Sequence, residues 1–216
     1  MGTPLEPAYR KRVGYQAMLL GGFSTLATAL LVAGNLATRD VIEERQREDL
    51  LDSLGQVVPP AHYDNDLLAH PLIIEADDRD PITIYRGTRG SDVSALAYEI
   101  SKPGYAGEIR LILGLDADGS ILGVRVLSHA ETPGLGDKIE VAKDNWMLEF
   151  NGLSIGNPPE SEWAVKKDGG RFDQFSGATI TPRAVVQAIK EGLDFYRDHR
   201  TELLNPPRIT TDMVKR

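Results

Sequence analysis

The stretch 173–182 reads DQFSGATITP, a turn of small and hydroxyl-bearing residues that leads into an amphipathic segment. Pro182 suits the first position of a helix, where a backbone N–H would have no helical acceptor. Thr181 then falls at the N-cap, a position that favours a side-chain oxygen. The start of such a helix presents free N–H groups and a positive dipole end, so it can hold an anion such as a phosphate.

After this turn the sequence predicts a helix. Apolar residues recur at the spacing of one helical face: Val185, Val186, Ile189, Leu193 and Tyr196. From the residues alone, two interpretations of the turn stay open. Its hydroxyls either make only turn and cap hydrogen bonds, or one of them lies within reach of a bound phosphate.

The same turn resembles a known modification motif, Asp-x-x-Ser-Gly-Ala-Thr, which spans residues 173–179 here. This is the flavinylation motif of the FMN-binding domain family found in Rnf and Na⁺-pumping NADH:quinone oxidoreductase complexes. Further stretches follow the order and spacing of the G subunits of Rnf (Rsx) complexes: 104–107 (GYAG), 129–138 (HAETPGLGDK) and 163–170 (WAVKKDGG). The similarity runs from the N-terminal apolar segment to about residue 197.

The resemblance implies which residues hold the cofactor. In this family a flavin transferase moves FMN from FAD onto the threonine that closes the motif, forming a phosphoester. Carried over, Thr179 is the covalent attachment residue, and Asp173 belongs to the context that the transferase recognises. The implied cofactor contacts come from the motif and from the loop after residue 130: Ser176, Gly177, Ala178, Glu131, Thr132, Gly134 and Leu135.

The implied function is electron transfer without independent catalysis. The resemblance indicates a membrane-anchored subunit that relays electrons within an Rnf-type ferredoxin:NAD⁺ oxidoreductase that pumps Na⁺ or H⁺. Its partners would be other membrane subunits, subunits that carry flavin or iron–sulfur groups, and the flavin transferase during maturation. Two alternatives stay open: a noncatalytic periplasmic scaffold that binds a small anion at the same helix start, and a free-standing flavin reductase.

Composition narrows the function classes. The net charge is −8 and no basic stripe is present, so nothing indicates a nucleic-acid partner. The chain has no cysteine, which excludes disulfides, thiolate nucleophiles and cysteine-ligated metals. The four histidines show neither metal spacing nor an acid/base partner in the sequence, so we assign no metal site and no catalytic residue.

The N-terminal region predicts a membrane anchor. Residues 13–38 contain no charged side chain, and as a helix they would span roughly 39 Å, enough for a bilayer core. Basic residues precede this span, so the tail 1–12 would be cytoplasmic and the main domain periplasmic, in the bacterial inner membrane. A signal peptide cleaved near residues 27–29 and a buried core helix are the alternatives.

The remainder predicts an α+β domain, with an antiparallel sheet and helices. We expect a stalk or linker at 39–60, the FMN-binding domain at 61–200 and an extended tail at 201–216. Strand patterns begin at residue 71 and form hairpins around turns at 87–92 and 116–119. A third hairpin is expected around 168–170, and a helix over 137–150. Lys166 or Lys167 would lie near the flavin, or else be solvated.

Overall fold

The structure is a computed structural model that describes residues 13–76 and 79–205. The predicted N-terminal tail and residues 206–216 lie outside this part. The chain divides into two compact units between residues 49 and 50. This boundary lies within helix α1 (Val13–Val57). The stretch Val13–Arg39 is long and apolar enough to cross a membrane, with a mean hydropathy of 1.8, and none of it is buried. The helix continues through the charged segment, as predicted, and ends before Pro59.

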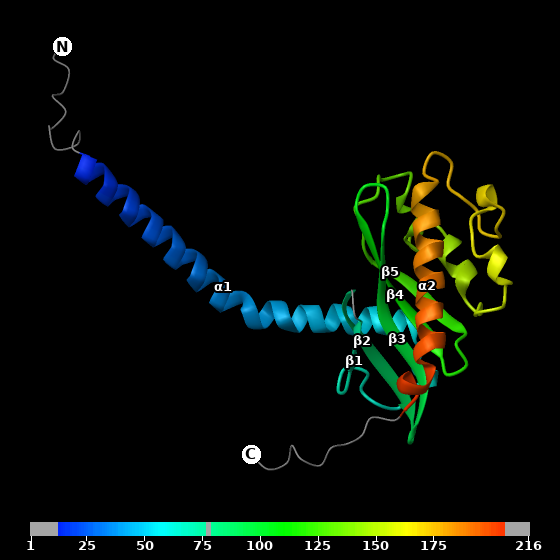
Figure 1. The fold of residues 1–216 in the computed structure, drawn as a ribbon. Coiled ribbons are helices and arrows are strands. Elements are labelled where there is room, and N and C mark those ends of the chain that lie inside the picture. Colours follow the sequence, from blue (N-terminus) through cyan, green and yellow to red (C-terminus); the bar gives the residue numbers. More distant parts are fainter. Residues whose placement is uncertain (1–12, 77–78, 206–216) are drawn as a thin grey trace. The chain divides into compact units, whose positions relative to one another are not determined.

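The second unit is built on a five-stranded antiparallel sheet (Figure 1). Each strand pairs with the next along the chain, so the order is that of a meander. The strands are β1 (Leu72–Ala76), β2 (Arg79–Arg89), β3 (Asp92–Pro103), β4 (Glu108–Asp116) and β5 (Ile121–Ser128). The predicted α+β class and both hairpins of the sheet are confirmed.

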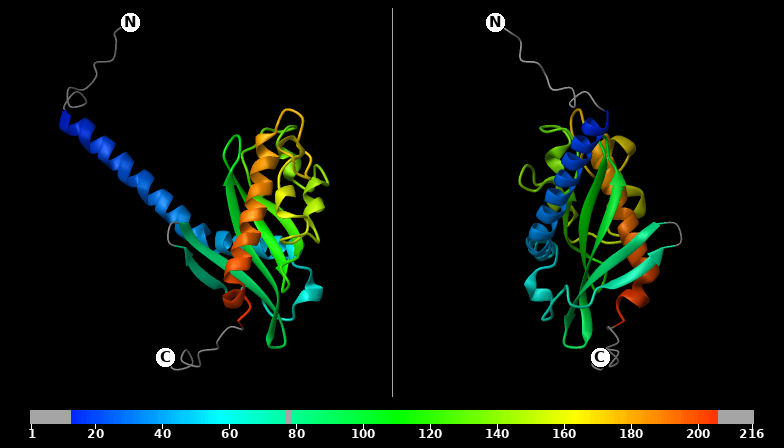
Figure 2. Two further views of the ribbon diagram at one scale, coloured as in Figure 1. Left: turned by 45° about the vertical axis from the view of Figure 1, so that its right-hand side comes forward. Right: turned by 90° about the vertical axis from the view of Figure 1, so that its left-hand side faces the viewer.

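Helix α2 (Ile180–Leu203) lies along one face of the sheet (Figures 1 and 2). Alternate residues of β4 share this face and are all buried there: Ile109, Leu111, Leu113 and Leu115. On the helix, Val185, Ile189 and Leu193 are buried as the periodicity predicts. The phenol of Tyr98 on β3 also donates a hydrogen bond to the carbonyl of Gly192, at 2.8 Å. α2 extends into the start of the predicted tail.

The opposite face of the sheet is covered by the end of α1 and the turn that follows. Leu54, Val57 and Val58 are buried against Ala97 and Ile112 of the sheet. A short 3₁₀ helix, η2 (Pro60–His62), follows this contact. The sheet therefore has an apolar layer on both faces, one from each end of the second unit.

The connection between β5 and α2 differs from the prediction. Instead of one helix over 137–150, it contains 3₁₀ helices η3 (Asp137–Ile139) and η4 (Trp146–Phe150). Glu140 is extended, and the Asp144 carboxylate accepts from the backbone N–H of Trp146 at 2.9 Å. Such a local side-chain bond competes with the helical hydrogen bonds. Of the apolar residues expected on one face of that helix, Ile139, Trp146 and Phe150 are buried but Ala142 is exposed, so the spacing was partly correct for burial and wrong for a continuous helix.

The predicted third hairpin is also wrong. The segment forms 3₁₀ helices η5 (Glu160–Glu162) and η6 (Lys166–Asp168), and Val165 and Phe172 are joined by an isolated parallel bridge. A Cβ on Gly170 would lie 2.0 Å from the carbonyl oxygen of Ala164. The chain therefore crosses itself closely here, which places Val165 and Phe172 in the core instead of in a two-stranded ribbon.

Candidate cofactor site

Helix α2 begins earlier than its proline suggested. The residue at the N-cap is Thr179, and Thr181 lies inside the first turn. The prediction that Thr181 caps the helix is therefore wrong. Its side chain is fully buried and its hydroxyl donates to the carboxylate of Glu131, a residue 50 positions earlier. Sequence spacing around Pro182 could not reveal this distant partner.

Thr179 has the opposite environment. It is half-buried, and in the described part of the chain its hydroxyl makes no hydrogen bond, not even a cap to its own helix. Its carbonyl accepts from the N–H of Arg183 at 3.4 Å. Since the first N–H groups of a helix have no acceptor within it, Thr179 stands beside unpaired donors at the positive end of the helix dipole.

The loop before Thr179 is held by an aromatic cluster. Phe175 is buried with its ring 5.1 Å from that of Trp146, and the indole N–H of Trp146 donates to the carbonyl of Asp173 at 3.0 Å. Gly177 has φ +80°, a conformation that favours glycine. Ser176 and Gly177 are exposed between the anchored ends of the loop.

Sequence reasoning missed this cluster as a support for the loop. Its rings pack edge-to-face or stacked at centroid distances of 4.6–6.4 Å, and they belong to Trp146, Phe150, Trp163, Phe172 and Phe175. The available signal was the placement of both tryptophans of the chain in a connection rich in glycine and proline. Aromatic side chains of that size need a core to bury them.

The second predicted loop lies beside the first. Leu135 is 43% exposed, and its Cδ2 atom would lie 3.6 Å from a Cβ on Gly177. The N–H groups of Leu135 and Gly136 both donate to the carbonyl of Thr132 at 3.1 Å, which closes a tight turn. Thr132 and Gly134 are exposed. The structure thus brings together the two loops that the sequence singled out separately.

Glu131 lies behind this surface. It is 5% exposed, and its Oε1 atom accepts from the backbone N–H groups of Tyr105 and Ala106, at 2.8 and 3.1 Å. Its Oε2 atom accepts from Thr181. Both carboxylate oxygens are therefore engaged within the protein.

Charged groups surround the motif in pairs. The ammonium of Lys166 lies 2.7 Å from the carboxylate of Asp173, and both side chains are more than half exposed. Arg183, in the first turn of α2, binds both carboxylate oxygens of Asp168, at 2.6 and 2.9 Å. The hydrogen bond that Arg183 donates to the Asp168 carboxylate raises the pKa of Arg183. Lys166 is thus placed at the motif, whereas the side chain of Lys167 makes no hydrogen bond or ion pair in the described part of the chain.

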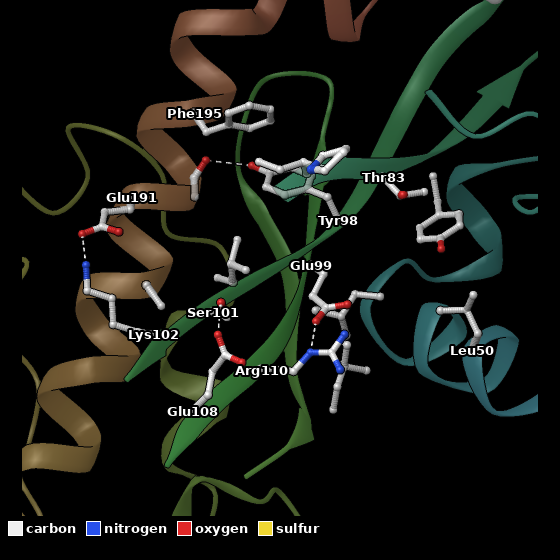
Figure 3. Close-up of a pocket in the computed structure, with 18 of the residues that line it drawn as sticks. Leu50, Thr83, Tyr98, Glu99, Ser101, Lys102, Glu108, Arg110, Glu191 and Phe195 are labelled. Carbon is white, nitrogen blue, oxygen red and sulfur yellow. Dashed lines mark hydrogen bonds and ion pairs between the residues drawn. The ribbon is translucent and has the colours of Figure 1, made fainter. Parts of the chain in front are cut away.

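A large cavity lies elsewhere in the described structure. It has a volume of about 1020 Å³ and opens where β2 and β3 part, beyond the pair Ile84–Tyr98. Figure 3 shows that its walls carry paired polar groups: Lys102 with Glu191, Ser101 with Glu108, and Arg110 with Glu99. None of the site residues expected from the sequence lines it. In the described residues, no group of three or more potential metal ligands is present.

Comparisons with known proteins identify the family. The FMN-binding domain family matches residues 104–194, which include both loops. The G subunit of the ion-translocating oxidoreductase complex of Cereibacter sphaeroides is 50% identical over 189 residues, covering 88% of this chain and 86% of the relative. The corresponding G subunit of Stutzerimonas stutzeri is 47% identical over 201 residues, covering 93% and 88%.

A solved structure supports the fold alone. The C subunit of the Na⁺-translocating NADH-quinone reductase from Parabacteroides distasonis aligns with a TM-score of 0.51 and 20% sequence identity. The alignment covers 73% of this chain and 95% of that one. The sheet and the helix packed on it are therefore a shared architecture.

Proposed function

Because the chain belongs to the family of G subunits of ion-translocating oxidoreductase complexes, we propose that it carries FMN as a phosphoester on Thr179 and relays electrons within such a complex. The observation that carries this proposal is the contrast between two neighbouring hydroxyls. Thr179 is half-buried and its hydroxyl makes no hydrogen bond to the described residues, whereas the hydroxyl of Thr181 is buried and bonded to Glu131. Only the first can accept a phosphoryl group without dismantling the core.

The surroundings of Thr179 fit the phosphate of FMN. The unpaired N–H groups at the start of α2 and the helix dipole both favour a negative group. Arg183 and Lys166 add positive charge at the same end of the helix, although each also binds a carboxylate. Gly177, Ala178 and Ser176 leave the approach to the hydroxyl open, since the first two carry little or no side chain.

The proposed attachment is a phosphoryl transfer with FAD as the donor and a flavin transferase as the catalyst. The Thr179 oxygen forms a bond to the phosphorus of the FMN half, and the bond from that phosphorus to the bridging pyrophosphate oxygen breaks. AMP leaves, and the hydroxyl proton passes to a base of the transferase or to solvent. No electrons are exchanged in this step. Asp173, which is exposed, would be read by the transferase.

When bound, FMN supplies one- and two-electron chemistry, and the protein supplies position and protection. The exposed edge formed by Thr132, Gly134 and Leu135 would contact the ring system beside the motif. Glu131 would act from behind this edge, because its carboxylate oxygens are already engaged. A covalent link removes loss of the cofactor by dissociation, and the ring would stay accessible to partner subunits.

The proposal also includes a membrane anchor, which is the N-terminal part of α1. α1 would cross the inner membrane once, with the basic N-terminus in the cytoplasm and the FMN-binding domain in the periplasm. Residues 13–38 contain no Asp, Glu, Lys, Arg or His. We therefore assign the ion path to other subunits. The parent activity would be ferredoxin:NAD⁺ oxidoreduction coupled to Na⁺ or H⁺ transport.

A denaturing gel tests the proposal. The full chain, purified from cells that contain the transferase, should fluoresce as a band under ultraviolet light before staining. Intact-mass analysis should show one added FMN less one water, and peptide mapping should place it on Thr179. A bare polypeptide would support a noncatalytic scaffold instead.

A further inference from the structure

We infer that Glu131 is a positioning residue for the Thr179 hydroxyl, acting through Thr181. The inference rests on the proposed attachment to Thr179. It concerns three segments that border the site: the turn at 104–107, the loop at 131–136 and the first turn of α2. Glu131 belongs to the loop at 131–136, and its carboxylate accepts hydrogen bonds from the turn at 104–107 and from the first turn of α2.

The carboxylate is enclosed as well as bonded. A Cβ on Gly104 would lie 2.4 Å from its Oε1 atom, and a Cβ on Gly136 would lie 2.8 Å from both its Oε2 atom and the Thr181 hydroxyl. Glycine at these two positions lets the backbone approach on both sides. The backbone N–H of Glu131 in turn donates to Nδ1 of His129 at 3.0 Å. Glu131 therefore has little freedom to move.

The hydrogen bond between Glu131 and Thr181 affects the position of Thr179 through helix geometry. Successive residues of an α-helix turn by about 100°, so residues two apart point to nearly opposite sides. With Thr181 fixed inward against Glu131, the first turn is held in the rotation that directs Thr179 outward. Without that bond the first turn keeps only the partly exposed pair of Arg183 with Asp168 as a side-chain anchor, since Thr179 makes no cap, and helix ends open readily when tertiary contacts are lost.

The position of the Glu131 carboxylate also determines the position of the loop at 131–136. Thr132 follows Glu131 directly, and Leu135, four positions after Glu131, lies beside Gly177 of the motif. A shift of Glu131 would therefore move the acceptor hydroxyl and the adjoining edge together. An ionised carboxylate suits this role because it accepts all three hydrogen bonds and donates none.

The experiment measures flavin transfer to the purified full-length protein without flavin, in detergent, with FAD and the transferase. Thr181→Val keeps the volume of the side chain but removes the hydroxyl. We expect its kcat/KM as a protein substrate to fall about tenfold or more, since misplacement of a reacting group by 1 Å can cost 10²-fold. Thr181→Ser, which restores a hydroxyl, should recover most of the rate, and Glu131→Gln should lie between.

Tyr98→Phe is the matched control. It removes another buried hydrogen bond, to Gly192, outside the site. It therefore lowers stability without changing the hydrogen bond between Glu131 and Thr181. Its kcat/KM for transfer, corrected for the folded fraction, should equal that of the wild type. Hydrogen exchange at 183–187, where the first amides bonded within the helix lie, should increase in Thr181→Val and stay unchanged in Tyr98→Phe.

The outcomes separate this inference from the proposed function. If the wild type accepts no flavin, or accepts it on another residue, the proposed function fails. If the wild type is labelled on Thr179 and folded Thr181→Val is labelled at the same rate, only the positioning role fails. If Thr181→Val does not fold, equal transfer rates for Glu131→Gln, Thr181→Ser and wild type, with equal exchange at 183–187, overturn the role.

Discussion

Trp146 donates its indole N–H to the carbonyl of Asp173 at 3.0 Å, which joins the aromatic cluster to the first residue of the attachment motif. Phe175, two residues later, packs edge-to-face on the same indole. One side chain thus holds the loop by a hydrogen bond and by ring contact. The position of the motif depends on residues far outside it.

Trp146→Phe should loosen this loop. The substitution leaves an aromatic ring in place but removes the donor, so the carbonyl of Asp173 loses its partner. We expect a loss of about 1 kcal/mol in the free energy of unfolding and faster hydrogen exchange at 173–178. Trp163→Phe is the control, because Trp163 belongs to the same cluster but makes no side-chain hydrogen bond in the described part of the chain. Equal exchange at 173–178 in the two variants would contradict the anchoring role.

Thr179→Val should abolish flavin attachment and leave the fold intact. The hydroxyl makes no hydrogen bond in the described part of the chain, so its removal should change the free energy of unfolding by no more than about 0.5 kcal/mol. Thr179→Ser keeps a hydroxyl and should retain some attachment. Intact-mass analysis and thermal unfolding measure the two effects. An unchanged flavin content in Thr179→Val would assign the attachment to another residue.

Gly114→Ala tests how closely the end of α1 packs on the sheet. A Cβ there would lie 2.3 Å from the carbonyl oxygen of Val57, a backbone atom that cannot rotate away. We expect a loss of about 3 kcal/mol in the free energy of unfolding, near the top of the usual range for overpacked sites. Gly55→Ala is the matched control, because nothing lies within 4 Å of its new Cβ. It should stabilise the helix by about 0.5–1 kcal/mol.

Thermal unfolding of the two variants gives the comparison. If Gly114→Ala and Gly55→Ala shift the unfolding temperature equally, residues 54–58 do not pack on the sheet as described.

The periodic parts of the fold could be predicted from the sequence. The alternation in β4 and the helical spacing from Val185 to Tyr196 mark the faces of the sheet and of α2 that pack in the same core, because the residues of one face recur at a fixed period. The apolar helical stretch at 13–38 was equally evident from its lack of charge. Local patterns of this kind need no knowledge of distant partners.

The connection from β5 to α2 could not be predicted in the same way. Its apolar residues pack on one another in a cluster whose members lie up to 29 positions apart, from Trp146 to Phe175. No single period describes such packing, so Ile139, Trp146 and Phe150 resembled a helical face. Thr181 was misassigned for a related reason, since its partner Glu131 belongs to another loop. Resemblance to the motif suggested the site, and the tertiary contacts determine that Thr181 is hydrogen-bonded whereas Thr179 is not, within the described residues.

Acid should destabilise the domain partly through Asp137, which is buried and lies 2.9 Å from the ammonium of Lys143. The backbone N–H of Gly134 and then Lys143 hold the pKa of this carboxyl below its ordinary value. The unfolded state therefore binds a proton more readily than the folded state. The resulting stabilisation is complete above the ordinary pKa, about 3.9, and disappears as the pH falls through the lower folded value.

Asp137→Asn should remove this dependence. We expect a lower unfolding temperature than the wild type at neutral pH and a shallower decline on acidification below about pH 5. Glu149→Gln provides a control of opposite sign, because burial, and then the charge of Asp173, raise the pKa of Glu149. Protonation of Glu149 favours the folded state, so its removal should make the acid decline steeper. Parallel curves of unfolding temperature against pH for the wild type and Asp137→Asn would show that Asp137 contributes nothing to the acid sensitivity.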